Sequence, residues 1–189
     1  MSDLPEKVIP WFCPKKRAIL EFKNLHLSTS TKKLLKKNPF TVTRNKDFRA
    51  VITECSSMTR KDQPGTWITS ALLEAYCALH ELGYAHSMEV WKGKKLVGGV
   101  YGVEIDGVVS AESMFHTESN ASKIALITWI QELEKLGCKW IDIQALTPHT
   151  KSIGGTEITR NSFLNRLHSA RESGVSFWSK RSEPSHPSS

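Results

Sequence analysis

The 189-residue sequence lacks the patterns expected of an exported or membrane-spanning protein. No segment approaches the roughly eighteen apolar residues that a membrane helix requires, and the opening residues MSDLPEKVIP contain no apolar core of signal-peptide type. The four cysteines lie far apart with no Cys-x-x-Cys pair, so the spacing favours neither a disulfide framework nor a zinc site. We therefore expect free thiols, no bound metal, no membrane association and a cytoplasmic location.

The charge balance favours an anionic partner. The chain has 26 Lys and Arg against 19 Asp and Glu, a net charge of +7, and a basic surface is the usual electrostatic feature of proteins that bind nucleic acid. A solvated basic face with no such partner is the alternative. With 39% hydrophobic residues, the chain has enough apolar material for one compact domain.

Hydrophobic periodicity and turn residues predict a helical first half. We expect a basic segment at 31–37, a strand at 40–43 and helices at 46–58 and 69–82. Residues 179–189 are rich in Ser and Pro, which predicts a disordered tail. The expected organisation is therefore a short N-terminal extension over 1–30, one domain over 31–178 and this tail.

The second half changes to strands. Residues 85–115 predict an antiparallel meander with turns at 92–94 and 106–107, followed by a helix at 120–136, a strand at 140–146 and a helix at 160–169. The late strand can lie parallel to its neighbour through the helical crossover. This order predicts an α+β fold with a mixed, mostly antiparallel sheet flanked by helices. It resembles the GNAT-type acyltransferase fold, in which the sheet opens between two central strands to receive the acyl donor.

Three polar residues interrupt the apolar strands. Glu112 lies between apolar residues, and Asp142 and Gln144 alternate with isoleucines, which places this pair on one face of an extended strand. One interpretation is a half-exposed sheet whose polar face meets solvent. The other is a polar floor to a binding cleft, since burying such groups without partners costs several kcal/mol.

Seven short segments, taken together, resemble the leucyl/phenylalanyl-tRNA–protein transferase family. Their order and spacing match that family over most of residues 9–168. The segments are W-F-C-P-x-x-R-A-I-L (11–20), G-T-W-I-T (65–69), H-E-L-G-Y-A-H-S-M-E-V-W (80–91), G-G-V-Y-G-V (98–103), E-S-M-F (112–115), N-A-S-K (120–123) and I-D-I-Q (141–144).

The resemblance implies a role for each matching residue. Glu112 matches the carboxylate that holds the α-amino group of the incoming amino acid, and Asp142 with Gln144 matches the pair at the reacting centre. Trp67 matches a tryptophan beside the aminoacyl-adenosine end. The side-chain pocket of the family corresponds to Val100, Val109, Met114, Leu126, Trp129 and Ile141, although an apolar stripe of this kind is also typical of a plain core. The basic positions that contact tRNA correspond to Lys32, Lys33, Lys36 and Lys37.

The implied activity is transfer of Leu, Phe or Met from a charged tRNA to the N-terminal α-amine of an acceptor protein, which marks that protein for degradation. The donor is already an activated ester, so we expect no cofactor, and positioning can supply much of the acceleration. Aminoacyl-tRNA and an acceptor protein or peptide N-terminus are the expected partners of a monomer. Gln144 has no useful basicity, so Asp142 would act through a polarised relay or with help from the tRNA ribose.

Three alternatives stay open. A divergent relative would use another acceptor, such as N-terminal Asp or Glu; a non-catalytic module would only bind aminoacyl-tRNA. An acetyl-CoA enzyme is disfavoured because the glycine-rich pyrophosphate loop is absent at 119–122. The family usually carries a longer N-terminal part with an earlier P-W-F-S-P segment, whereas Trp11 here fits the second of two similar segments. The adenosine platform, for which Trp11 is our candidate, is therefore the least defined part of the expected site.

Overall fold

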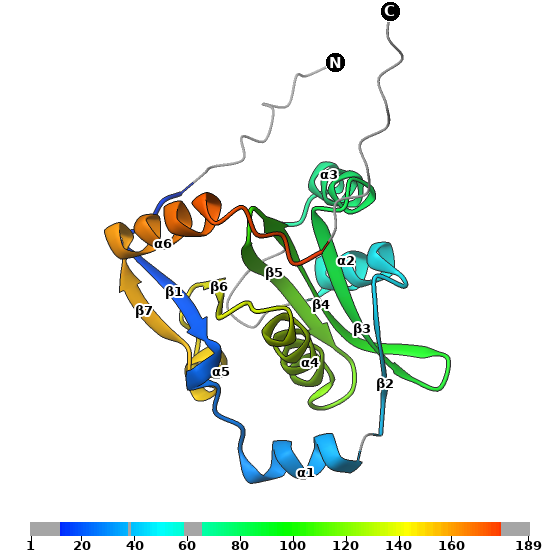
Figure 1. Cartoon of the computed structure of the whole chain (residues 1–189). Helices are drawn as coiled ribbons and strands as arrows, with labels where there is room; N and C mark the ends of the chain where they lie inside the picture. The colour runs from blue at the N-terminus through cyan, green and yellow to red at the C-terminus, as the bar shows by residue number, and fades with distance from the viewer. Residues whose placement is uncertain (1–11, 38, 59–65, 179–189) are drawn as a thin grey trace, which may run out of the picture.

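The computed structural model describes residues 12–37, 39–58 and 66–178. These residues form a seven-stranded sheet with helices around it (Figure 1). The strands are β1 (Lys16–Glu21), β2 (Thr41–Arg44), β3 (Ala85–Lys92), β4 (Lys95–Ile105), β5 (Val108–His116), β6 (Trp140–Gln144) and β7 (Thr156–Thr159). The α-helices are α1 (Thr29–Lys37), α2 (Phe48–Ser57), α3 (Ser70–Glu81), α4 (Ala121–Lys135), α5 (Pro148–Ser152) and α6 (Arg160–Glu172), and a 3-10 turn spans Phe22–Asn24.

The strand order across the sheet is β2-β3-β4-β5-β6-β1-β7. Every neighbouring pair is antiparallel except β5 and β6, which are parallel and joined by the crossover helix α4. The mixed, mostly antiparallel sheet and its helical crossover confirm the predicted GNAT-like architecture.

The sheet opens between its two parallel strands. β5 and β6 share one paired position, Ser110 with Asp142, and beyond it the strands separate. Both strands also carry a bulge close to that point. In β5, Tyr101 pairs with Ser113 and Gly102 with Ala111, which leaves Glu112 as the extra residue. Bulges of this kind redirect a side chain and are frequent beside active sites.

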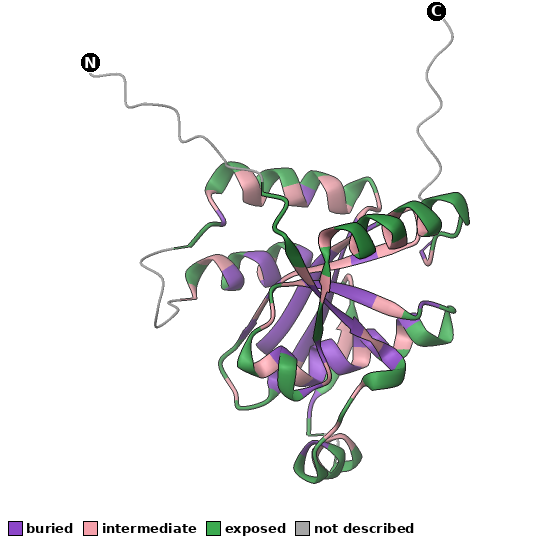
Figure 2. Ribbon diagram, turned by 90° about the vertical axis from the view of Figure 1, so that its left-hand side faces the viewer, coloured by how far each residue is buried: buried purple, intermediate pink, exposed green. Residues whose placement is uncertain are grey.

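Helices cover both faces of the sheet, and the alternation of side chains along β4 shows how. Val100 joins the core cluster that contains most of α4, whereas the next residue, Tyr101, joins a second cluster with α2 and α3. Successive strand residues point to opposite faces, so α4 lies opposite α2 and α3. Figure 2 shows buried residues concentrated in the central strands and the helices packed on them, while α1 at the bottom is mostly exposed.

Three elements were not predicted from the sequence. β1 lies within the expected N-terminal extension yet occupies an interior position of the sheet, between β6 and β7. α5 and β7 fall in the stretch between the last predicted strand and helix. β6 also ends at Gln144 rather than at 146. The predicted tail, 179–189, lies outside the described residues.

No helix among the described residues combines the length and the apolar character needed to cross a bilayer. The longest, α4, has 15 residues.

We predict that Gly98→Ala destabilises the contact between β4 and α4. A Cβ at this position would lie 2.5 Å from the Ala121 side chain and 2.9 Å from its backbone carbon. Because both neighbours are rigid, the variant should lose about 1–3 kcal/mol of unfolding free energy, measured by urea denaturation.

The matched control is a double-mutant cycle with Ala121→Gly. Removing the nearer methyl should make the double variant more stable than the sum of the two single losses indicates. Strict additivity, or an unchanged midpoint for Gly98→Ala alone, would show that α4 does not pack against β4 this closely.

Candidate functional site

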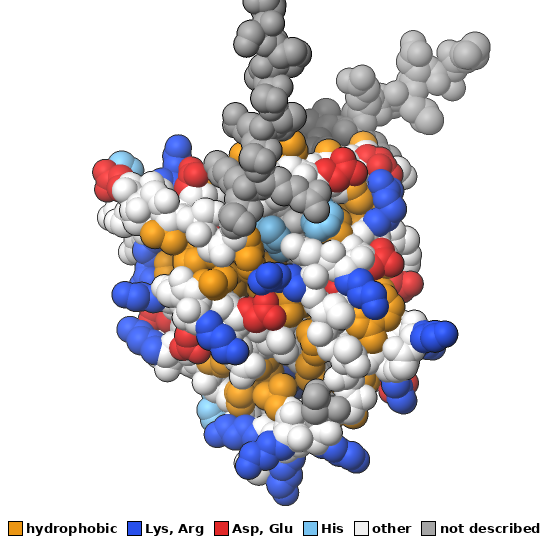
Figure 3. Space-filling view, turned by 45° about the vertical axis from the view of Figure 1, so that its right-hand side comes forward, with side chains coloured by type: hydrophobic (Ala, Val, Ile, Leu, Met, Phe, Trp, Pro, Cys, Tyr) orange, Lys and Arg blue, Asp and Glu red, His pale blue; other side chains and the backbone are white. Residues whose placement is uncertain are grey.

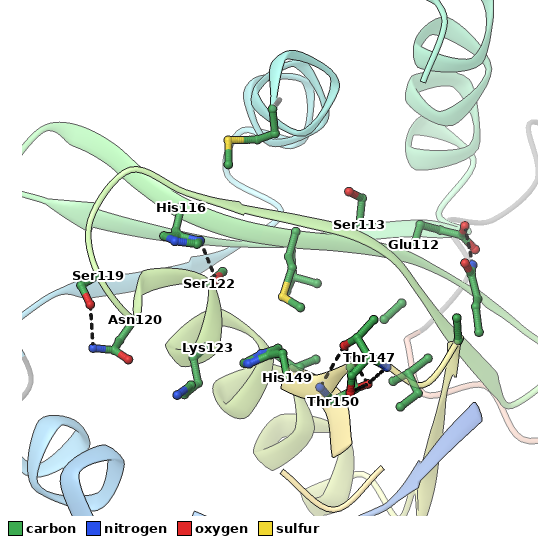
Figure 4. Close-up of a pocket in the computed structure, with 18 residues that line it drawn as sticks. Glu112, Ser113, His116, Ser119, Asn120, Ser122, Lys123, Thr147, His149 and Thr150 are labelled. Atoms are coloured by element: carbon green, nitrogen blue, oxygen red, sulfur yellow. Dashed lines mark hydrogen bonds between the residues drawn. The ribbon is translucent and has the colours of Figure 1, made fainter. Parts of the chain in front are cut away.

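A cavity of about 700 Å³ lies where β5 and β6 separate. Its walls come from β4, β5 and β6, the loop before α4, the first turns of α4, α5, and Met58 at the end of α2. Figure 4 shows its two ends: Glu112 lies at one, and His116, Asn120 and Lys123 lie at the other. The opening of the sheet thus creates a cavity whose ends differ in charge.

Glu112 is held at its end of the cavity by two neighbouring side chains. The carboxamide nitrogen of Gln144 donates to Glu112 Oε2 over 2.8 Å, and Tyr76 of α3 forms a further hydrogen-bonding interaction with the carboxylate. Burial raises the pKa of Glu112, and the hydrogen bonds from Gln144 and Tyr76 oppose that rise, whereas the nearby charge of Asp142 adds to it. The described residues provide no salt bridge to this carboxylate.

Tyr76 responds to the same carboxylate. Burial, the charge of Glu112 and their hydrogen bond all raise the pKa of the Tyr76 phenol well above its ordinary value. The phenol therefore stays protonated at neutral pH and remains a hydrogen-bond donor. Tyr76 has no distinctive signal in the sequence, because it belongs to the apolar stripe of α3.

Gln144 has an unusual backbone conformation. Its φ is +61°, in the left-handed region that residues other than glycine rarely adopt. Its backbone N–H donates to Asp142 Oδ1 over 2.8 Å. The β1–β6 register also shifts at this point, since Ala18 pairs with Gln144 and Ile19 with Asp142, leaving Ile143 extra. The alternation expected of an extended strand therefore does not continue through this pair.

Asp142 is buried, with 3% of its surface exposed. It forms a salt bridge with Arg17 of β1, whose Nη2 lies 2.8 Å from Asp142 Oδ2 and whose Nε lies 3.0 Å from Oδ1. The hydroxyl of Ser110 donates to Oδ2 over 3.1 Å. The interpretation of Asp142 as a solvent-facing residue of a half-exposed sheet is therefore wrong, and its partners Arg17 and Ser110 were not identified from the sequence.

The apolar candidates fall into two groups. Val100, Met114 and Leu126 line the cavity. Val109, Trp129 and Ile141 are at most 1% exposed and belong to the core cluster that also contains Val100 and Leu126 and against which Met114 packs. Trp129 packs against Trp178 with ring centroids 6.2 Å apart. The three core residues therefore support the cavity wall rather than form its surface.

The candidate tryptophans lie elsewhere. Trp67 precedes α3 and is 41% exposed. Its ring meets the edge of Tyr76, with centroids 6.3 Å apart, so Trp67 is one aromatic contact away from the residue that bonds Glu112. Trp11 lies outside the described residues.

The end of the cavity opposite Glu112 carries basic side chains that were not predicted as site residues from the sequence. Lys123 and His116 face it from α4 and β5, and His149 from α5. The Ser122 hydroxyl and His116 Nδ1 are 3.3 Å apart. Burial, followed by the charges of Lys123 and His116, lowers the pKa of His149, so its imidazole is neutral near pH 7. The three residues come from separate segments, which is why no local pattern indicated them.

The predicted basic segment forms the helix α1. Lys32, Lys33, Lys36 and Lys37 are all exposed, while Leu34 and Leu35 pack against the core. Figure 3 shows basic side chains gathered at the lower end of the molecule, where α1 lies. The leucine side of α1 therefore attaches the helix to the domain, while the four lysines remain exposed to solvent.

Within the described residues, no group of three or more His, Cys, Asp or Glu side chains is arranged to hold a metal ion.

Comparisons with known proteins agree on one family. Residues 19–168 match the family model described as leucyl/phenylalanyl-tRNA protein transferase. The chain is 45% identical over 174 residues to a leucyl/phenylalanyl-tRNA–protein transferase of Shewanella halifaxensis, covering 91% of this chain and 73% of the relative. The enzyme of the same name from Citrobacter koseri is 45% identical over 179 residues, covering 94% and 75%.

Among solved structures, the fold is similar to that of FemX, with a TM-score of 0.56 and 12% identity over 82% of this chain and 64% of the other. A conserved protein of unknown function from Staphylococcus epidermidis gives a TM-score of 0.51 at 11% identity, over 76% and 57%. At such low identity these similarities concern the fold alone.

We predict that the pKa of Glu112 lies above that of an ordinary glutamate and rises further when a donor is removed. Gln144→Leu and Tyr76→Phe each remove a hydrogen bond to the ionised carboxylate, so each should raise the pKa again. Titration of ¹³C-labelled glutamate carboxyls by NMR measures this, with Met114→Leu as a cavity control that removes no donor. An ordinary or lowered pKa in the unmodified protein would contradict the burial of this group.

Proposed function

The chain belongs to the leucyl/phenylalanyl-tRNA–protein transferase family, and we propose that its cavity is where an aminoacyl group passes from a charged tRNA to the N-terminal α-amine of an acceptor protein. The proposal assigns Glu112 to the amino group of the donor, the apolar wall to its side chain and Gln144 to the attacking amine. Helix α1 is assigned to the tRNA.

The observation that carries this proposal is the environment of Glu112. Its carboxylate is partly buried at the end of a cavity with apolar walls, and its hydrogen-bond partners Gln144, Tyr76 and Ser110 are all neutral. A buried carboxylate without a cationic partner is costly, and an ammonium group entering the cavity would supply that partner. The α-amino group of an aminoacyl ester provides such an ammonium group.

The apolar wall suits the side chain of the donor. Val100, Met114 and Leu126 line the same cavity as Glu112, so we place the side chain of an amino acid anchored at Glu112 against them. Methionine and leucine side chains adapt to ligands of different shape. Leu, Phe and Met are therefore the proposed donors, because a charged side chain would lose its hydration here without gaining a partner.

Gln144 has one polar atom left for the acceptor. An ionised carboxylate accepts hydrogen bonds and does not donate them. The carboxamide nitrogen of Gln144, and not its oxygen, therefore faces Glu112. The carboxamide oxygen remains to accept an N–H of the attacking amine. Holding the amine beside the ester replaces an encounter in solution with a positioned attack.

The reaction balances without a further reactant. The amine nitrogen attacks the ester carbonyl, the C–N bond forms, and the ester C–O bond breaks. The ribose oxygen of the tRNA leaves and takes up one proton, while the former amine loses one. Because Gln144 is not a base, its role in this step is orientation.

Helix α1 is the proposed tRNA contact. Four exposed lysines on one helix suit phosphate contacts that do not depend on sequence. Figure 4 shows α1 in blue below the end of the cavity where Asn120 and Lys123 lie. We assign that basic end, with His116, to the phosphates of the 3′ end as it enters.

We predict that the protein transfers radiolabelled Leu, Phe or Met from tRNA to peptides that begin with Arg, Lys, Asp or Glu, tested one by one. Glu112→Gln should lower kcat/KM for the donor by more than about tenfold, because the ammonium group loses its counter-charge. The pKa of Glu112 is raised, so donor binding should weaken as the pH falls through this pKa and the carboxylate becomes protonated. The affinity of Glu112→Gln for the donor should not show this decrease at acidic pH.

Glu157→Gln is the control, because this exposed residue of β7 pairs only with Lys16 among the described residues. If none of the peptides is labelled while tRNA binding is intact, the chain is a tRNA-binding module and the proposed enzymatic activity is wrong. Labelling only of Asp or Glu peptides would select the divergent acceptor specificity.

We predict that reversing the charge of the α1 lysines weakens tRNA binding and flattens its salt dependence. Each lost phosphate contact should reduce the slope of log K against log salt by about 0.7–0.9. The variant changes Lys32, Lys33, Lys36 and Lys37 to Glu, and the control of equal charge changes Lys94, Lys95, Lys135 and Lys139 to Glu. Equal slopes for the two variants would assign tRNA binding to the net charge rather than to α1.

A further inference from the structure

We propose that Arg17 is a positioning residue of the transfer reaction. Through Asp142 it holds the backbone of Gln144 in its left-handed conformation, and through Gln144 it fixes the orientation of Glu112. This inference rests on the proposed function, but it concerns Arg17 of β1 and Asp142 of β6, which contact neither the donor nor the acceptor in that proposal.

The hydrogen bonds of Asp142 form a complete set. A carboxylate has about four lone-pair directions, two on each oxygen. Oδ1 receives Arg17 Nε and the backbone N–H of Gln144, and Oδ2 receives Arg17 Nη2 and the Ser110 hydroxyl. The four donors lie 2.8–3.1 Å from these oxygens. Asp142 therefore has no lone pair left for a proton from the amine.

The bond to Gln144 explains the strained backbone. A left-handed φ in a residue with a side chain costs about 1–3 kcal/mol and persists only where the surroundings impose it. Here the Asp142 carboxylate accepts the N–H of that residue, and the bulge at Ile143 places the two residues for this contact. The resulting turn brings the Gln144 carboxamide to Glu112, which comes from the bulge of β5.

Arg17 is suited to this position by its geometry. Its two N–H groups meet the two carboxylate oxygens side by side, which fixes the plane of the carboxylate as well as its place. The guanidinium also lies 5.3 Å from the ring centroid of Phe163 in α6. Phe163 in turn packs edge-on against Trp140 at the start of β6. The guanidinium is therefore held between the carboxylate and an aromatic ring.

The pair spans a large separation in the chain. Arg17 and Asp142 are 125 residues apart, and β1 is the strand that separates β6 from β7.

A lysine in place of Arg17 would keep the charge but could not make both parallel bonds. The positioning proposal therefore predicts different results for the loss of the charge and for the loss of the geometry.

The test compares Arg17→Met, Arg17→Lys and the double variant Arg17→Met/Asp142→Leu in the full chain. Arg17→Met should lower kcat for Leu transfer about 10- to 100-fold, because small misplacements at a reacting centre cost rates of this size. Arg17→Lys should recover part of this loss. Lys16→Met is the matched control, since it removes an exposed charge from the neighbouring position of β1 and should leave transfer unchanged.

The double variant Arg17→Met/Asp142→Leu separates positioning from a merely structural role. This variant removes both members of the ion pair and should regain stability, yet transfer should stay low because the Gln144 N–H has lost its acceptor. A double variant with full kcat would overturn the proposal.

Hydrogen exchange tests the same inference without any transfer assay. In Arg17→Met the backbone amide of Gln144 should exchange at least about tenfold faster, while amides in the central strands β3 and β4 stay protected. Unchanged exchange at Gln144 would overturn the positioning proposal even if transfer occurs. Failure of the unmodified protein to transfer any amino acid would overturn the proposed function and leave the exchange result standing.

Discussion

The site depends on a single point of attachment between two parallel strands. β5 and β6 pair only at Ser110 and Asp142, and the Ser110 hydroxyl also bonds the Asp142 carboxylate. Had the two strands continued to pair, their ladder would have filled the space that the cavity occupies. The strands instead separate immediately after this contact, and each carries a bulge near the opening.

The two carboxylates near this point, the buried Asp142 and the partly buried Glu112, differ in the charge of their partners. Asp142 is neutralised by the guanidinium of Arg17 and receives every hydrogen bond it can accept. Glu112 receives bonds only from neutral groups, and burial raises its pKa. The first carboxylate is satisfied by the protein, and the second has no cationic partner among the described residues. This difference in surroundings is why we propose a positioning role for Asp142 and a binding role for Glu112.

The sequence predicted those parts of the fold that local patterns encode. The meander, the crossover helix and the parallel strand after it follow from periodicity and from the turns at 92–94 and 106–107. It did not predict β1 or β7, since the short runs 16–21 and 156–159 carry no local signal, and sheet position is set by distant partners. Family resemblance, not periodicity, identified Glu112, Asp142 and Gln144 as a group. Arg17 and Tyr76 had no signal because each acts through a residue far along the chain.

The interior position of β1 affects how the molecule reaches its native state. Residues near the start of the chain must insert between β6 and β7, which come after residue 139. During synthesis, the central meander and α4 can therefore form before the strand that completes the sheet has any neighbour. Contacts between such distant segments form slowly, because a long loop must close first. A chain released before β6 and α5 are made would contain β2 to β5 but would lack the cavity walls that β6 and α5 supply.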